Sequence, residues 1–293
     1  MKNSHWENEE IEFLKNNYQN MTHAELATCL NRTKTAVDLK LNRLNLKKTK
    51  HCYNVDFFKD IDNQDKAYWL GFIFADGYIV YKDTLPACYE FCIELQQSDY
   101  MHLKKFNTAI QGNLQIVYRS RPSYFDNTKI HRSALIRIYN KRFVSNLMTH
   151  GVVQNKSLTK CFPVISDDLL PHFIRGYYDG NGCVCKDDLR KKLFQCNFTC
   201  GSLDFVSKLR EKLFQNNIHS YIICEQEHSY RLYIKGIENC TKFLQYIYTD
   251  AHYMLDRKYN KALRLFKEFN YKHRLPLHSE TSGFFKAREK RES

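Results

Sequence analysis

The stretch FIRGYYDGNGCV, Phe173–Val184, places an apolar and aromatic run directly before two glycines that flank a polar residue. A second stretch, WLGFIFADGYI at Trp69–Ile79, has the same shape: apolar residues around a glycine, then an acid, a glycine and an aromatic residue. Two occurrences of one pattern at domain-length spacing indicate a repeat. The chain is therefore expected to contain a duplicated structural unit.

A second pair of segments supports the same duplication. Gly77 and Gly182, at the ends of the two motifs, differ by 105 in residue number. The same offset pairs Asp99, in QQSDYMHLKKF, with Asp204, in GSLDFVSKLREKLF. One offset that relates two separate segments argues for two copies of one unit.

Composition limits the class of protein. The chain has 293 residues, of which 43% are hydrophobic, enough to bury two or three packed units. The formal net charge is +13, and the basic residues are spread over several segments. This balance favours a polyanionic partner, with nucleic acid ahead of a membrane, over a basic protein whose charges are only solvated.

The eleven cysteines do not form a recognisable metal or disulfide pattern. Met1–Glu10 is polar and acidic and does not resemble a signal peptide, so the thiols are expected to be reduced and buried. Neither Cys183 with Cys185 nor Cys196 with Cys200 has CxxC spacing, which argues against structural zinc. No apolar run has membrane-spanning length.

Residues 1–50 are predicted to form three short helices. Thr22 opens the second helix with Glu25 three positions later, the pattern of a capping box. The stretch resembles Myb-like and resolvase-like helix-turn-helix modules, whose last helix enters a major groove. The predicted DNA-contacting residues of that helix are Lys34, Thr35, Lys40 and Arg43. A protein-interaction bundle is the alternative interpretation.

The remaining chain divides into a linker, two repeats and a tail. Residues 51–66 are predicted to be a linker, 67–165 the first repeat, 166–274 the second repeat and 275–293 a basic tail. Each repeat can be divided into a helix, two strands, a helix, two strands and a helix. The fold class is therefore α+β.

LGFIFADGYI and IRGYYDGNGCV resemble the two signature helices of LAGLIDADG homing endonucleases in their single-chain, two-repeat form, over about residues 55–270. The resemblance implies two pseudo-symmetric αββαββα repeats that form a DNA-binding saddle, preceded here by the small three-helix domain. It also implies a monomer that hydrolyses phosphodiesters on both strands of double-stranded DNA.

The spacing within the motif has a physical reason. Gly71 and Ala75 are four residues apart, as are Gly176 and Gly180, so each helix has a face that is nearly bare of side chains. Two such faces allow close helix packing, which brings the ends of the helices together. Ordinary core helices capped by glycine are the alternative interpretation.

A cation is expected at these helix ends. Asp76 lies at a helix C-terminus, where the macrodipole disfavours a carboxylate. Mg²⁺ or Mn²⁺ would relieve that cost, polarise a scissile phosphate and activate water. The second predicted metal ligand is Asn181, the counterpart of Asp76 in the second motif.

Asn181 departs from the family, whose members usually carry a carboxylate in both motifs. Asp179 does not replace it, because Asp179 aligns with Phe74, and a position that accepts phenylalanine is not an obligatory ligand. Asparagine keeps a carbonyl oxygen but removes one negative charge. Three explanations remain open: a weaker natural site, a copy that nicks one strand or only binds, and a substitution that disables cutting.

The resemblance also marks two lysines as catalytic residues. Lys156, in GVVQNKSLTKCFP, lies where family members carry an active-site lysine, and Lys258, in YMLDRKYNK, is the candidate in the second repeat. Each would stabilise developing negative charge or orient the attacking water. A solvated surface charge is the alternative for both.

Outward-facing strand residues are the predicted readers of DNA bases. Arginine pairs well with guanine, and glutamine or asparagine with adenine. About half of the candidates are expected to contact phosphate or solvent instead. They are Arg119, Arg121, Arg137, Gln195, Asn197, Arg231, Tyr233 and Lys235.

The sequence thus predicts an intracellular, site-specific DNA endonuclease with a long asymmetric target, in the cytoplasm or nucleoid of a bacterial or phage-infected host or in an organelle. A non-cleaving, sequence-specific DNA-binding protein is the alternative that Asn181 favours. An RNA maturase is a third interpretation, although aromatic RNA-binding signatures are absent.

Overall fold

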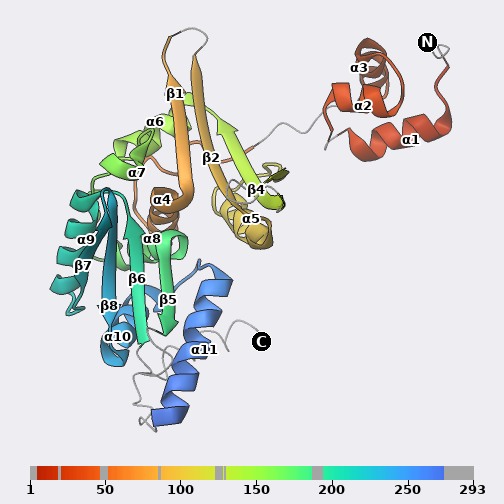
Figure 1. The fold of residues 1–293 in the computed structure, drawn as a ribbon. Coiled ribbons are helices and arrows are strands. Elements are labelled where there is room, and N and C mark those ends of the chain that lie inside the picture. Colours follow the sequence, from red (N-terminus) through yellow and green to blue (C-terminus); the bar gives the residue numbers. More distant parts are fainter. Residues whose placement is uncertain are drawn as a thin grey trace. The chain divides into compact units, whose positions relative to one another are not determined.

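The computed structural model describes residues 5–18, 21–46, 52–84, 87–122, 128, 130–186 and 194–273, with side chains up to residue 265. It contains two compact units (Figure 1). Residues up to Cys52, with Asn113–Gln115, form the N-terminal unit. The described residues of Tyr53–Gly112 and those from Ile116 onward form the main unit. The predicted basic tail, 275–293, lies outside the described residues.

Three helices form the N-terminal unit: α1 (Asn8–Asn17), α2 (His23–Cys29) and α3 (Lys34–Arg43). The Thr22 hydroxyl accepts from the Glu25 backbone N–H while the Glu25 carboxylate accepts from that of Thr22, so the expected capping box starts α2. The helices enclose a core of their own. Its buried residues are Leu14, Leu26, Ala27, Leu30, Val37 and Leu41.

The first repeat supplies one four-stranded antiparallel sheet. Its elements are α4 (Gln64–Asp76), β1 (Gly77–Lys82), β2 (Cys88–Gln96), a short 3₁₀ turn η1 (Gln97–Asp99), α5 (Tyr100–Ala109), β3 (Val117–Pro122), β4 (Ile130–Tyr139) and α6 (Lys141–Thr149). The strand order is β1-β2-β4-β3. The short helix α7 (Lys156–Thr159) follows.

The second repeat has the same order of elements. They are α8 (Leu170–Asn181), β5 (Gly182–Lys186), β6 (Phe194–Cys200), α9 (Leu203–Gln215), β7 (Tyr221–Gln226), β8 (Ser229–Lys235) and α10 (Ile237–Tyr248). The strand order, β5-β6-β8-β7, repeats that of the first sheet. The predicted α+β fold of two αββαββα repeats is therefore confirmed.

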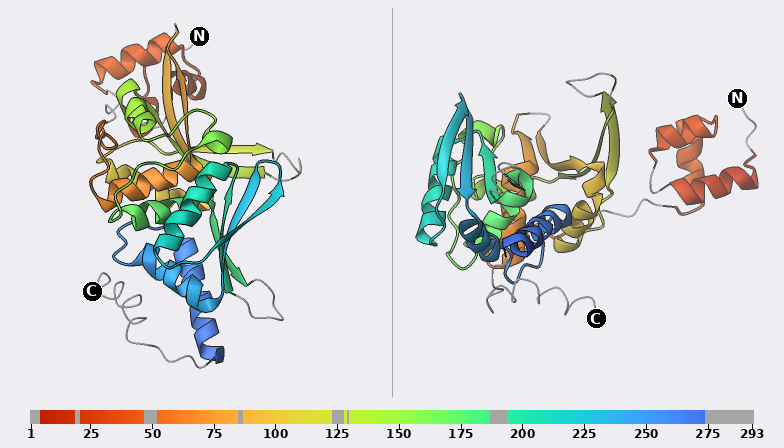
Figure 2. Two further views of the ribbon diagram at one scale, coloured as in Figure 1. Left: turned by 90° about the vertical axis from the view of Figure 1, so that its left-hand side faces the viewer. Right: turned by 60° about the horizontal axis from the view of Figure 1, so that its bottom comes forward.

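Within the described residues of the main unit, helices cover one face of each sheet and none covers the other, which is called the free face here (Figure 2). In the first sheet, Phe91 packs against Phe106 of α5 and Phe143 of α6, with ring centroids 5.9 and 5.3 Å apart. In the second, Phe198 lies 5.7 Å from Phe243 of α10. Because side chains alternate along a strand, the polar positions between these core residues line the free face.

Helices α4 and α8 pack side by side between the two sheets (Figure 1). Both helices are apolar along most of their length, and their aromatic residues join the two repeats. Phe74 of α4 lies edge-on to Phe173 of α8, with ring centroids 5.5 Å apart, and both are fully buried. The helix pair is thus the shared core of the main unit.

Three features of the main unit differ from the sequence predictions. Residues 53–66 are packed and do not form a linker: Phe57 and Phe58 are buried, and the Asn54 N–H donates to the carbonyl oxygen of Ile110. A helix that was not predicted, α11 (Asp256–His273), follows α10 within the predicted bounds of the second repeat, 166–274. The cysteines are all free, but only Cys92, Cys196, Cys200 and Cys240 are buried.

Within the described residues, no helix combines the length and the apolar character that a membrane crossing requires.

Candidate active site

Bare backbone is what permits the close approach of α4 and α8. A Cβ placed on Gly71 would overlap the carbonyl oxygen of Phe173, and one on Gly176 would overlap that of Tyr68. A Cβ on Gly180 would collide with the Cβ of Ala75. The four small residues predicted at the helix interface therefore all lie in it.

The two helices end together, in the same way. Gly77 and Gly182 follow the last helical residues with extended backbone (φ −80°, ψ 155° and φ −91°, ψ 162°), and each begins a strand. Asp76 and Asn181 are thus structurally equivalent last residues. The Asp76 carboxylate lies against the end of α8, since a Cβ on Gly180 would be 3.2 Å from its Oδ2 atom.

Asp76 is a mostly buried carboxyl group in a cationic setting. Burial raises its pKa, and the charges of Lys258, Lys156 and Arg257 partly oppose that rise. Its position at a helix C-terminus adds unfavourable dipole interaction. The neighbouring cations therefore offset only part of the cost of ionising Asp76, and a metal ion would offset more.

Lys156, at the start of α7, forms a hydrogen bond with the backbone at the end of α4. Its Nζ atom donates to the carbonyl oxygen of Gly77, and the side chain is buried. Burial and, to a smaller extent, repulsion from Lys160 lower its pKa to about 8, while attraction to Asp76 acts in the opposite direction. The ammonium group is therefore part of the helix-end cluster and not a solvated surface charge.

Lys258, on α11, forms hydrogen bonds with the backbone at the end of α8 in the same manner. Its Nζ atom donates to the carbonyl oxygens of Tyr178, Gly180 and Gly182 at 3.1, 2.8 and 2.6 Å. Burial lowers its pKa to about 8, opposed by Asp179 and Asp76. Each helix C-terminus thus has its own lysine cap, which the macrodipole favours.

Lys160 belongs to the same cluster and was missed in the sequence. Its buried Nζ atom lies 3.4 Å from the carbonyl oxygen of Phe74 and 4.7 Å from the Tyr177 ring centroid. Burial lowers its pKa, while Cys200 and Asp76 oppose the shift. Its spacing of four from Lys156 was the available signal, because residues four apart face the same side of a helical turn.

Asn181 and Asp179 differ in whether they have an oxygen atom available for a metal ion. The Asn181 amide nitrogen donates to the Tyr177 hydroxyl at 3.3 Å, so the carbonyl oxygen is the atom suited to ligation. Asp179 is fully buried and accepts from the hydroxyls of Tyr68 and Tyr248 and from the Leu255 N–H. Its oxygens are used inside the core, which agrees with its exclusion as a ligand.

The donor set fits a divalent cation held partly by substrate. No group of three or more His, Cys, Asp or Glu side chains suited to a metal occurs among the described residues. Asp76 supplies one carboxylate and Asn181 one carbonyl oxygen. Mg²⁺ usually retains waters and takes one or two carboxylates plus substrate phosphate oxygens, so this small set is sufficient only with a phosphate present.

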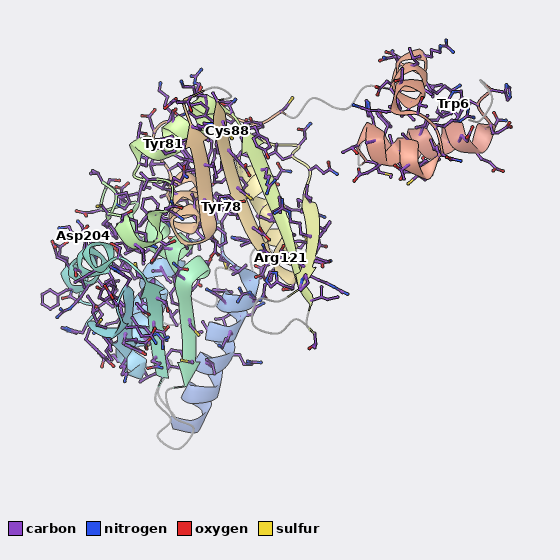
Figure 3. The ribbon with its side chains drawn as sticks, turned by 45° about the horizontal axis from the view of Figure 1, so that its top comes forward. Trp6, Tyr78, Tyr81, Cys88, Arg121 and Asp204 are labelled. Carbon is purple, nitrogen blue, oxygen red and sulfur yellow. The ribbon has the colours of Figure 1, made fainter. Side chains whose placement is uncertain are left out.

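The free face of the first sheet carries arginines that are already paired. Arg121 lies 3.1 Å from Glu94, and Arg119 lies 3.9 Å from the same carboxylate. Arg137 lies 3.0 Å from Glu90. Figure 3 marks Arg121 on β3 and Tyr78 on β1, the two edge strands of this sheet. All three predicted readers lie on the free face, where two glutamates pair with them and offset part of their charge.

The second sheet is more crowded on its free face. Gln195 and Asn197 point outward, yet each is only 8% exposed, because Lys235 and Tyr233 lie opposite them on β8. Arg231 pairs with Glu225 at 3.0 Å. The Lys235 ammonium lies 5.4 Å from the Tyr233 ring centroid.

In the N-terminal unit, the predicted DNA-contacting residues of α3 are not equivalent. Lys34, Thr35 and Arg43 are exposed. Lys40 is half-buried, with its ammonium 5.6 Å from the centroid of the Trp6 ring, so part of its side chain packs within the unit.

The cap lysines predict a dependence of stability on pH. In the folded chain the pKa of Lys156 is about 8, against 10.5 for an ordinary lysine, so the unfolded chain binds more protons between these values. The free energy of unfolding should therefore rise with pH in this window, by up to about 1.4 kcal/mol per pH unit for one lysine. Urea unfolding between pH about 8 and about 10 should give a shallower rise for Lys156→Met. Equal slopes for the two proteins would contradict a buried, charged Lys156.

Comparison with known proteins identifies the second repeat directly. Residues 168–248 match the model of the LAGLIDADG-like domain. No curated protein matches the chain. Among solved structures, the homing endonuclease I-WcaI bound to its DNA recognition sequence is similar over 69% of this chain and 90% of its own, with 14% identity and a TM-score of 0.50.

Two further solved structures are similar at lower scores. The LAGLIDADG meganuclease I-AabMI bound to uncleaved DNA covers 78% of this chain and 98% of its own, with 12% identity and a TM-score of 0.48. The N-terminal LAGLIDADG domain of DUF199/WhiA covers 72% and 93%, with 16% identity and a TM-score of 0.43. With its matched second repeat and its two-repeat architecture, the main unit has the fold of the LAGLIDADG homing endonucleases.

Proposed function

We propose that this protein is a divalent-metal-dependent DNA endonuclease that acts as a monomer inside cells on a long, asymmetric target. One observation carries the proposal: Asp76 lies against the end of α8, within a cluster that contains a lysine cap for each helix. A buried carboxylate beside several buried cations is costly for a purely structural core and suits a polyanionic substrate.

The free faces of the two sheets would bind the duplex. Their arginines pair with Glu90, Glu94 and Glu225, so binding of a duplex would exchange these ion pairs for contacts with phosphates or bases. Such preformed pairs weaken the attraction of the arginines for DNA of any sequence. They favour a target whose contacts with the arginines are stronger than the ion pairs that are lost. Because the two faces carry different side chains, the target has no twofold symmetry. The helices of the N-terminal unit would add contacts to flanking DNA.

Catalysis would take place where the helices end. A bound Mg²⁺ or Mn²⁺ would polarise the scissile phosphate and activate water. Asp76 and the carbonyl oxygen of Asn181 would hold it. Lys156 and Lys258, fixed by the helix-end carbonyls, would stabilise negative charge that develops on the phosphate.

Asn181 makes the site asymmetric. With one carboxylate instead of two, cation affinity falls on one side, and we infer that one strand is cut faster than the other. The same asparagine favours a second candidate function, a sequence-specific DNA-binding protein that does not cut. The two functions share the free sheet faces and differ only in the chemistry at Asp76.

A two-step experiment tests the proposal. Duplexes bound by the full-length protein are first selected from a randomised pool in Ca²⁺, and the selected target is then placed in a supercoiled plasmid. In Mg²⁺ we expect open circles first and linear product later. A plasmid that is bound but stays supercoiled would support the non-cleaving function. Failure to bind any duplex would reject both.

A further inference from the structure

Helix α11 lies along the open edge of the second sheet. β5 is the edge strand, and α11 packs beside it (Figure 1). The helix buries one side, with Tyr259, Ala262 and Leu265 in the core. The opposite side carries Arg257, Lys261 and Arg264, at spacings of four and three that align them along one stripe.

A pocket of about 530 Å³ lies between this stripe and β5. Its lining is rich in cations and contains no carboxylate; it comprises Gly182, Cys183, Val184, Arg257, Lys258, Asn260, Lys261 and Arg264. The strand register places Cys183 opposite Asn197, which is itself opposite Tyr233, so Cys183 belongs to the free face of the sheet. The pocket therefore borders the face that would bind DNA, one residue beyond Asn181.

The cations of the pocket are not equally available. Arg257 is held by both oxygens of Asp99 at 3.0 and 2.8 Å, and Lys258 is committed to helix-end carbonyls. Lys261 and Arg264 are exposed, and in the part of the chain that the structure describes no carboxylate lies within ion-pair distance of either. The Lys261 ammonium donates to the Cys183 sulfur at 3.9 Å.

We propose that this pocket binds a backbone phosphate of the DNA, next to the phosphate at the helix ends, through Lys261 and Arg264. The inference rests on the proposed DNA binding and assigns to α11 a contact outside the two sheets. Its chemistry follows from the lining: a cation-rich cleft that has no carboxylate in its lining and lies beside a strand edge suits the singly charged, repeating phosphates of a duplex. A positive stripe along a helix also matches the linear path of a DNA strand.

The test measures how binding depends on salt. The probe is a labelled, mixed-sequence linear duplex, titrated with the full-length protein at increasing KCl in Ca²⁺. The double variant Lys261→Glu/Arg264→Glu should reduce the magnitude of the log–log salt slope by about 1 to 2, since each lost phosphate contact removes about 0.9. At a fixed moderate salt it should bind at least about tenfold more weakly.

The matched control has the same change in charge away from this pocket. Lys208→Glu/Lys242→Glu alters α9 and α10, where both lysines pair with a glutamate on their own helix. It should keep the wild-type slope. The neutral variant Lys261→Gln/Arg264→Gln, checked for an unchanged melting temperature, guards against misfolding and should show the same slope loss.

The outcomes separate the two proposals. A steep wild-type slope that the α11 variants leave unchanged would reject the phosphate pocket and leave the proposed function standing. An equal loss in the control variant would also reject it, because the effect would then reflect net charge alone. No binding by the wild type would overturn both proposals.

Discussion

Asp76→Asn should abolish magnesium-dependent cleavage while leaving the fold intact. The change keeps the shape of the side chain but removes the single carboxylate at the helix ends. Loss of an outer partner of a metal ligand already costs 10–100-fold in affinity or activity, so loss of the ligand itself should cost more than about 100-fold. Stability should be unchanged or higher, because burial raises the pKa of Asp76 and disfavours its ionised form.

Cleavage of the selected plasmid and the melting temperature are measured together. Asp62→Asn is the control, since Asp62 is an exposed carboxylate that pairs with Lys66 at the start of the same helix. It should cut at the wild-type rate. If the Asp76→Asn protein still cuts, Asp76 has no role in the chemistry. If it misfolds, the role of Asp76 is structural.

Gly176→Ala should be strongly destabilising. The new Cβ would overlap the carbonyl oxygen of Tyr68 and lie 2.7 Å from the backbone nitrogen of Phe72. Backbone atoms cannot move aside like the tip of a side chain, so α4 and α8 must separate and lose packing along their whole contact. Overpacking of a core typically costs about 1–3 kcal/mol, and a clash between two helix backbones should reach or exceed the upper value.

Urea unfolding of Gly176→Ala and Gly112→Ala measures this effect. At Gly112 the nearest contact of a new Cβ is the side-chain oxygen of Asn107, which can rotate away. The midpoint of Gly112→Ala should therefore stay much closer to wild type. If Gly176→Ala were equally stable, the close helix approach would not be the basis of the shared core.

Much of this architecture could be predicted because local sequence signals agree with it. The duplicated motif gives both helices of the shared core, and Gly77 and Gly182 mark where each helix gives way to a strand. Threonine followed by glutamate at the third position gives the start of α2. In each of these cases a residue's neighbours in sequence are also its neighbours in space.

Other features depend on partners that are distant in sequence. Glu94 meets Arg121 only after β2, β4 and β3 pair in one register, so the ion pairs of these arginines could not be inferred from strand alternation. Lys160 became part of the site only through contact with α4 and α8. One side of α11 is buried because Tyr259 packs against Tyr248 of α10, with ring centroids 5.1 Å apart.

The most direct test of one shared site at the paired helix ends is Asn181→Asp. The substitution restores a second carboxylate beside Asp76, which should strengthen cation binding on the weaker side. In Mg²⁺, the variant should convert the selected supercoiled plasmid to linear product at least about tenfold faster than wild type, a gain of about 1.4 kcal/mol in transition-state stabilisation. Linearisation at the wild-type rate or below it would contradict the pairing of Asp76 with Asn181.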